Sequence, residues 1–181
     1  MDQSARLTYR RAAAADLDEL CRHWRRPEVR RYLWDGRELA REEAAAAVAA
    51  GAAAASIGGG VWRVSAAGGR FVGVCALLPL APEVEAALRP AAPGATAELA
   101  PPLVELVYSL EPAEWGRGYA REAAAAAVAH AFSRGHGAVL AGADEANTAS
   151  QRVLEAIGMA PLASFELPGV GPQRYYARRA G

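Results

Sequence analysis

The residues with the clearest chemical meaning form a short turn, Trp115-Gly116-Arg117-Gly118-Tyr119. An apolar, β-like run over 103–110 precedes this turn, and a long alanine-rich helical run follows it. Such a strand–turn–helix junction leaves backbone N–H groups unpaired at the positive end of the helix dipole. The sequence therefore predicts a site for a phosphate-bearing ligand, with the amides of residues 115–120 as donors and Arg117 as an added charge.

Two other glycine-rich phosphate loops do not fit this turn. A Walker A loop requires Gly-Lys-Ser/Thr, and all 20 basic residues of the chain are Arg. A Rossmann fingerprint requires a third glycine and a βαβ unit at the start of the chain, and the sequence offers neither. A Gly-x-Gly pair by itself is also compatible with a flexible turn that binds nothing.

Three further polar residues are candidates for a site near the turn. Asn147 follows a short apolar run over 138–142, so its side chain can cap the next helix or bind a ligand amide. Ser150 lies almost one turn further on and can share that helix face, or it is an ordinary first-turn serine. Glu105, in the run before the glycine turn, is by itself compatible with an outward-facing or salt-bridged glutamate.

The apolar periodicity predicts the elements that position these residues. Strands are expected at 7–11, 61–66, 70–80, 104–110, 138–142, 162–167 and 174–177. Helices are expected over 28–33, 42–55, 119–134 and 147–157, and after an Asp16 N-cap with Glu19 as its capping-box partner. The order predicts an α/β fold of the α+β type, with a mixed, mostly antiparallel sheet of about seven strands and helices on both faces.

Composition limits the class of protein. We expect one domain over 1–181, with the Ala- and Pro-rich segment 81–102 as a surface excursion that has one helical turn around 84–88. The zero formal net charge gives no electrostatic case for a nucleic-acid partner. The longest uncharged stretch, 44–62, is mostly Ala and Gly, so no membrane partner is expected.

Cysteine, histidine and the N-terminus add three expectations. Cys21 and Cys75 lie far apart, and the three histidines show no ligand spacing, so we expect no metal. The first residues lack the apolar core of a signal peptide, so a cytoplasmic location is expected.

The glycine turn belongs to a longer pattern, Pro-x-x-Trp-Gly-Arg-Gly-Tyr-Ala-x-Glu-Ala, over 112–123. This pattern resembles the acetyl-coenzyme A signature of the GCN5-related N-acetyltransferases (GNAT), and most closely its ribosomal-protein N-terminal acetyltransferase branch. Trp115 takes the first position of the family's Gln/Arg-x-x-Gly-x-Gly/Ala, while Gly118 and Ala120 match it. Residues 147–159 resemble the family's Asn-x-x-Ser-x-x-Val-Leu-Glu-x-x-Gly-Phe helix, with Met159 in place of the aromatic residue. A looser match covers 24–33.

The resemblance implies an N-acetyltransferase that moves an acetyl group from acetyl-CoA directly to a primary amine, on a protein N-terminus or a small molecule. It implies neither a metal nor a covalent enzyme intermediate. The alternative is a non-catalytic CoA-binding or sensory module. Dimers are frequent among similar proteins, so a homodimer stays an option.

The resemblance also implies a role for each candidate residue. Glu105 would accept the amine proton through a water, and Ser150 would lie near the sulfur and protonate the departing thiolate. Tyr32 and Trp34 would wall the acceptor pocket. Acetyl-CoA would be bound by a set of backbone and side-chain groups from Tyr108, Ser109, Leu110, Trp115, Gly116, Arg117, Gly118, Tyr119, Ala120 and Asn147.

Overall fold

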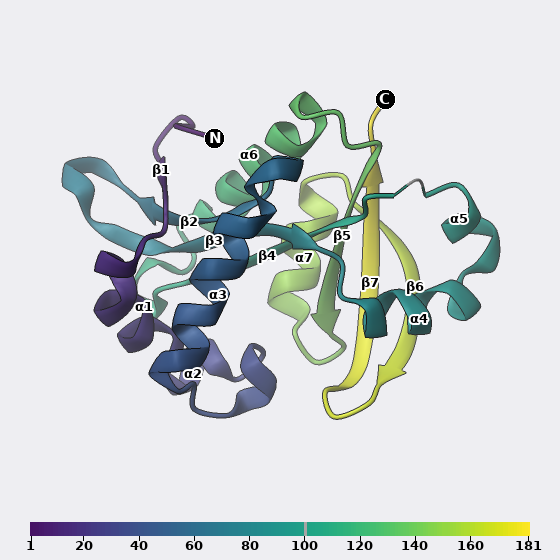
Figure 1. Ribbon diagram of the computed structural model, residues 1–181, viewed down its shortest axis with the longest axis horizontal. Helices are drawn as coiled ribbons and strands as arrows, with labels where there is room; N and C mark the ends of the chain where they lie inside the picture. The colour runs from purple at the N-terminus through teal and green to yellow at the C-terminus, as the bar shows by residue number, and fades with distance from the viewer. Residues whose placement is uncertain (100) are drawn as a thin grey trace.

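The computed structural model of the chain describes residues 1–99 and 101–181. Its seven strands form one sheet in the order β1-β2-β3-β4-β5-β7-β6 (Figure 1). The strands are β1 Thr8–Arg11, β2 Gly60–Ser65, β3 Phe71–Pro79, β4 Val104–Leu110, β5 Ala138–Asp144, β6 Ala160–Leu167 and β7 Gly171–Arg179. Neighbouring strands are antiparallel except for the parallel pair β4–β5. The predicted mixed, mostly antiparallel sheet of one α/β domain is confirmed.

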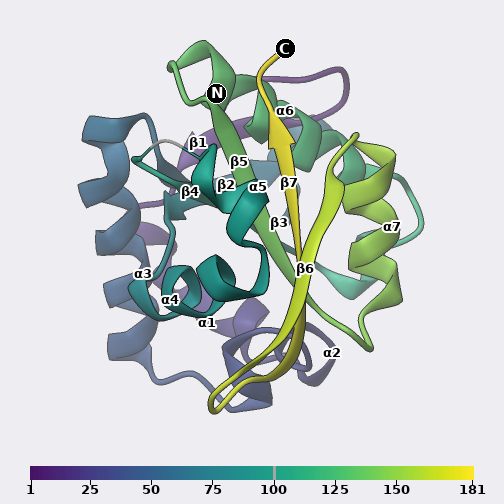
Figure 2. The same ribbon diagram turned by 90° about the vertical axis from the view of Figure 1, so that its right-hand side faces the viewer.

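Helices cover both faces of this sheet, as the sequence predicted. Figure 2 shows α6 and α7 on one side and α1, α3 and α4 on the other. The helices are α1 Leu17–Trp24, α2 Pro27–Arg30, α3 Arg41–Ala53, α4 Pro82–Ala91, α5 Pro93–Ala97, α6 Tyr119–Ser133 and α7 Thr148–Ala156. Across the two described ranges, every helix is too short or too polar to span a lipid bilayer.

The alanine-rich sequence of α6 has a packing role. Its buried face consists almost entirely of small residues: Ala123, Ala124, Ala127, Val128 and Ala131. Alanine has the highest helix propensity, and its single methyl lets the helix axis approach the sheet closely. The helix packs against β3 and β4, where the Cys75 Sγ lies 3.8 Å from the carbonyl oxygen of Ala123. The start of α6 is thereby fixed beside the end of β4.

Strand β4 lies at the centre of the molecule and is paired unequally on its two sides. It pairs with β3 along its whole length, from Val104 to Leu110. With β5 it pairs at only two positions, Val104↔Val139 and Glu105↔Leu140. Both strands continue beyond these pairs, so their carboxyl ends diverge. Even-numbered residues of β4 pack toward α6, and odd-numbered residues face α1–α3.

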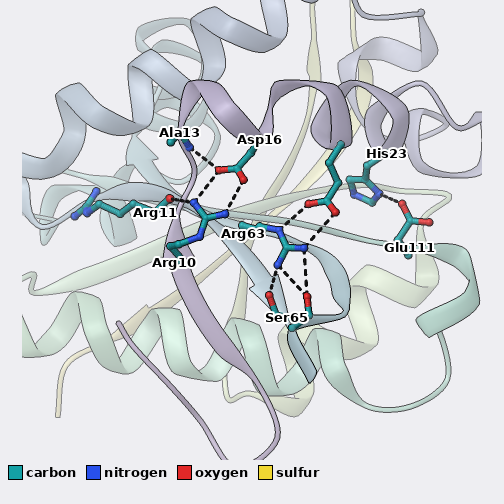
Figure 3. Close-up of polar contacts among 10 residues, drawn as sticks. Arg10, Arg11, Ala13, Asp16, His23, Arg63, Ser65 and Glu111 are labelled. Atoms are coloured by element: carbon teal, nitrogen blue, oxygen red, sulfur yellow. Dashed lines mark hydrogen bonds and ion pairs between the residues drawn. The ribbon is translucent and has the colours of Figure 1, made fainter. Parts of the chain in front are cut away.

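Asp16 does not cap α1, contrary to the sequence prediction. It ends a 3-10 turn, and its carboxylate accepts the Ala13 N–H at 2.8 Å and pairs with Arg10 at 2.6 Å (Figure 3). Glu19, the expected capping partner, binds Arg63 of β2 instead. Pairing with an arginine joins two ionised groups and can be bidentate, which favours it over a bond to a backbone N–H. Arg63 lies 44 residues from Glu19, so that pair has no local signal in the sequence.

The segment 81–102 contains more helix than the single turn expected around 84–88: Pro82–Ala91 forms α4 and Pro93–Ala97 forms α5. Ala100 lies outside the described residues. Val84 and Leu88 are buried in a cluster with Leu140 of β5 and Tyr175 of β7. The helical spacing of Leu80, Val84 and Leu88 carries this information, but the surrounding Ala and Pro residues obscure it.

Candidate active site

The glycine turn has the backbone geometry of an anion site. Gly116 and Gly118 have φ values of +74° and +77°, a left-handed conformation that strains any residue with a Cβ. The Glu122 N–H donates to Gly118 O at 3.1 Å, so the amides between these two residues precede the helical hydrogen-bond ladder. The positive end of the α6 dipole lies at the same place. The turn can therefore receive a phosphate.

The N-terminal segment braces this turn. The Arg6 guanidinium donates to Arg117 O at 2.9 Å and pairs with Glu122 at 2.7 Å, and the Ser4 hydroxyl donates to Glu122 at 2.7 Å. Burial raises the pKa of Glu122, but these hydrogen bonds outweigh it and hold the pKa below its ordinary value. The guanidinium groups of Arg6 and Arg117 are both about half exposed, so the turn is bordered by two solvent-facing cations. The role of Arg6 was missed because more than a hundred residues separate it from Glu122.

Trp115 ties the turn to the end of β4. Its indole Nε1–H donates to Leu110 O at 2.9 Å, while the residue is 51% exposed. This large apolar surface is therefore presented to solvent at the edge of the glycine turn.

Asn147 and Ser150 lie at the start of α7, close to β4. The Asn147 Oδ1 accepts the Ser150 N–H at 3.1 Å, so Asn147 caps the helix. The Ser150 hydroxyl lies 2.8 Å from the phenol oxygen of Tyr108. Burial raises the pKa of Tyr108 to about 12, so its phenol is protonated at neutral pH. The two hydroxyls thus bridge β4 and α7; the sequence indicated only the Tyr108 backbone.

Glu105 lies at the point where β4 and β5 begin to diverge. Its carboxylate accepts the Tyr175 O–H at 2.9 Å. Its neighbours across the sheet are Leu78 and Leu140. Burial among such apolar groups raises the pKa of Glu105, and the Tyr175 hydrogen bond opposes that rise only partly. The raised pKa makes this carboxylate a stronger base than an ordinary glutamate.

A cavity of about 230 Å³ opens on the odd-numbered face of β4. Trp34, one of the two predicted acceptor-pocket residues, lines it. The phenol of Tyr32, the other, donates to Ala146 O at 3.5 Å, next to the α7 cap. The lining residues are Trp24, Leu33, Trp34, Ala47, Val61, Val74, Ala76, Leu78, Val107, Tyr108 and Ser109.

A buried histidine contacts Ser109, one of the residues that line this cavity. His23 of α1 has no solvent exposure, and its Nε2 lies 2.9 Å from Ser109 Oγ. Its Nδ1 lies 2.8 Å from the Glu111 carboxylate (Figure 3). Arg26 pairs with Glu111 at 2.9 Å. Burial lowers the pKa of His23, so the ring is neutral at physiological pH and can accept a hydrogen bond from Ser109. Sequence reasoning missed this cluster because 86 residues separate His23 from Ser109.

The histidines and cysteines do not gather into a ligand set. Cys21 and Cys75 are buried in separate apolar clusters on opposite faces of the sheet. In the described part of the chain, no three His, Cys, Asp or Glu side chains are placed to hold a metal ion.

The acetyltransferase (GNAT) domain model matches residues 6–160. The chain belongs to the acetyltransferase (GNAT) family. This membership confirms the prediction of an N-acetyltransferase that uses acetyl-CoA. No curated protein matches the chain by sequence.

Many solved structures share the GNAT fold seen here. A GNAT-family acetyltransferase from Bacillus anthracis is 20% identical, with a TM-score of 0.74 over 98% of this chain and 97% of that chain. RimL, a ribosomal α-N-protein acetyltransferase in complex with coenzyme A, is 16% identical, with a TM-score of 0.73 and coverages of 97% and 95%. An aminoglycoside acetyltransferase in complex with coenzyme A is 14% identical, with a TM-score of 0.73 and coverages of 96% and 94%. At these identities the likeness shows the fold alone.

Proposed function

We propose that this GNAT protein binds acetyl-CoA along β4 and transfers its acetyl group directly to a primary amine. The observation that carries the proposal is the divergence of β4 from β5 immediately before the glycine turn. Beyond Glu105, β4 presents backbone groups toward the gap, and an amide-containing ligand can pair with them as a strand would. The complexes with acetyl-CoA or coenzyme A among the similar structures support acetyl-CoA as the ligand.

The predicted donor-binding residues can then be assigned to successive parts of acetyl-CoA. The amides of residues 115–120, with Arg117 beside them, receive the pyrophosphate at the start of α6. Those backbone groups of residues 108–110 that face the gap, and not β3, bind the pantetheine arm and polarise the thioester carbonyl. Asn147 already caps α7 through its Oδ1, so it would contact the pantetheine through its NH₂ group.

The reaction needs three proton transfers: the ammonium loses one proton before attack, the nitrogen loses a second after attack, and the thiolate gains one. The amine must first lose its ammonium proton, which Glu105 accepts, directly or through a water. The nitrogen lone pair then forms a bond to the acetyl carbonyl carbon, the carbon–sulfur bond breaks, and its electron pair leaves with sulfur as a thiolate. The hydrogen-bonded pair of Ser150 and Tyr108 supplies the proton that converts this thiolate into free coenzyme A. The second nitrogen proton replaces the one that the Ser150–Tyr108 pair gives to sulfur.

The decisive test measures the thiol released from acetyl-CoA with a panel of amines: peptides with free N-termini, amino acids, arylalkylamines, polyamines and aminoglycosides. The proposal expects amine-dependent release of coenzyme A and an acetylated amine of matching yield. Calorimetry run in parallel measures acetyl-CoA binding. Tight binding without turnover of any amine would instead support a non-catalytic coenzyme A-binding module.

A further inference from the structure

The walls of the 230 Å³ cavity are unusual for a site that receives a charged amine. Apart from Tyr108 and Ser109, every described side chain that lines it is apolar, and none carries a charge. Trp24 and Trp34 form one wall, with ring centroids 5.6 Å apart and an edge-to-face geometry. Ala47 of α3 and Val107 of β4 contribute to the other walls of the cavity. The cavity offers dispersion contacts and desolvation to its occupant, with no counter-charge of its own.

A carboxylate lies next to the cavity on the same face of β4. Glu105 lies two residues before Val107 on β4, so the two side chains point to the same face of the sheet. The cross-strand partner of Glu105, Leu78, lines the cavity. One ammonium group can therefore be held at Glu105. A second ammonium inside the cavity would be buried without a partner, which is strongly unfavourable. This arrangement selects against polyamines and aminoglycosides.

The size of the cavity limits the apolar body that carries the amine. An apolar protein cavity of about 150 Å³ is large enough to bind benzene. A volume of about 230 Å³ accommodates one ring with a short linker. It is smaller than the roughly 300–1,000 Å³ typical of pockets for drug-sized ligands.

Trp34 adds a directional requirement. Its φ is +56°, a left-handed conformation that a bulky residue adopts only under strain. Its indole Nε1 is buried, and none of the described residues accepts its hydrogen. A buried donor without a partner is destabilising, so a ligand oxygen that reaches this N–H, with a shift of the indole ring, would relieve a deficit already built into the site.

We propose that the acceptor is an arylalkyl monoamine, with its ring in this cavity, its nitrogen at Glu105 and an oxygen within reach of the Trp34 indole. An aromatic amino-acid amide has all three features. The inference rests on the proposed acetyl transfer and narrows its acceptor. Trp34 is then a specificity determinant that acts through its N–H as well as its ring.

The first experiment compares kcat/KM for phenylalaninamide, 2-phenylethylamine, spermidine and kanamycin at saturating acetyl-CoA. The two aromatic monoamines should be preferred over the polycations by at least about tenfold, because each buried methylene alone contributes about 10–200-fold to discrimination. Preferential turnover of spermidine or kanamycin would overturn this inference and leave acetyl transfer intact. Turnover of no amine, with acetyl-CoA still bound, would overturn both.

A matched pair of variants on α3 tests whether the cavity holds the acceptor. Ala47→Glu puts a carboxylate at a lining position, whereas Ala46→Glu makes the same change at the exposed neighbouring residue. The ratio of kcat/KM for 2-phenylethylamine over spermidine should fall about tenfold or more in Ala47→Glu and keep its wild-type value in Ala46→Glu. Ala47→Gln separates charge from size. Equal ratios in all three variants would place the acceptor elsewhere.

Trp34→Phe tests the indole N–H while keeping an aromatic ring. It should raise KM for phenylalaninamide about tenfold relative to KM for 2-phenylethylamine, which has no oxygen to accept the hydrogen bond. Because the readout is a ratio between two acceptors, a partly unfolded variant still gives a valid result. An equal change in KM for both acceptors would show that the Trp34 N–H does not bind the acceptor.

Discussion

Glu105 is held between two influences, and the balance sets the pH range in which it can act. Burial raises its pKa, and the hydrogen bond donated by Tyr175 lowers it. Because the base must be ionised to accept a proton, kcat/KM should fall as pH falls through this raised pKa, with a midpoint above the ordinary glutamate value of about 4.3. Glu105→Gln should remove this acid limb and lower kcat by about 10²–10⁴-fold.

Tyr175→Phe is the companion variant for that measurement. It removes a hydrogen bond that stabilises the ionised carboxylate, so the midpoint of the acid limb should move to still higher pH. Rate profiles of the two variants and the wild type at saturating acetyl-CoA check both results. If the acid limb of the pH profile were unchanged in Glu105→Gln, another group would accept the amine proton. The Ser109–His23 pair would be the next candidate.

Gly118 tests the phosphate site. Space is not the obstacle to a side chain here, because a Cβ would meet only the Arg6 guanidinium, at 3.5 Å. Gly118→Glu should instead act through its φ of +77° and through repulsion between its carboxylate and the pyrophosphate. Like charges placed together cost several kcal/mol, so calorimetry should show acetyl-CoA affinity weakened by about 10²-fold or more.

Gly68→Glu is the matched control. Gly68 has a φ of +72° in a turn between β2 and β3, where an added Cβ would meet no atom within 4 Å, so the backbone strain and the added charge are the same. This variant should show a similar loss of stability and wild-type acetyl-CoA affinity. Equal affinities for the two variants would contradict the assignment of the cradle.

At the scale of elements, the position of β4 depends on its close contact with β3. Gly73 of β3 has a φ of +152°, and a Cβ there would overlap the Ser109 carbonyl and approach the Leu110 Cα to 2.7 Å. Gly73→Ala should therefore displace the carboxyl end of β4 and cost about 1–3 kcal/mol of unfolding free energy, as overpacking typically does. Chemical denaturation measures this, and KM for acetyl-CoA should rise with it.

Gly69→Ala provides the comparison for β4. Gly69 also has a positive φ, +77°, but a Cβ there would have no neighbouring atom within 4 Å. Gly69→Ala should lower the unfolding free energy through backbone strain alone and keep the wild-type KM for acetyl-CoA. If Gly73→Ala also kept that KM, the end of β4 would not be part of the donor site.

Elements were predictable from sequence where local pattern alone decides them. The bounds of β4 follow from a run rich in apolar and β-branched or aromatic residues that ends before Pro112, and α6 follows from a glycine turn followed by strong helix formers. The pairing of Glu19 and the packing of the segment 81–102 were not predictable, because their partners are distant: Arg63 binds Glu19, and Leu140 and Tyr175 receive the buried face of α4.

The candidate site likewise has a part that the sequence predicts and a part that it does not. The glycine turn and the capped start of α7 have spacings that the sequence shows directly. The His23–Ser109–Glu111 cluster and the Arg6 brace join segments that are 86 and more residues apart, and each member alone is an ordinary surface or core residue type. Only the folded sheet brings them together.

For the whole molecule, the sheet is two parts joined at the β4–β5 seam, which has two registered pairs. A ligand that fills the gap beyond the seam binds the native state and not the unfolded chain, so acetyl-CoA at 100 times its Kd should add about 2.7 kcal/mol of stability. For a chain of this length that corresponds to a rise in Tm of about 5–10 °C. Differential scanning fluorimetry checks it, and Gly118→Glu should show no rise.

The two proposed ligand sites also draw on different stretches of the chain. Groups for the donor come from residues 104–150, whereas most walls of the acceptor cavity come from residues 24–78, with β4 the one element common to both. Substitutions that accumulate in α1, α3 and the segment between them can therefore alter which amine is accepted without disturbing acetyl-CoA. In evolutionary terms, a lineage built on this scaffold can exchange its acceptor by drift in the first half of its gene while purifying selection preserves the second.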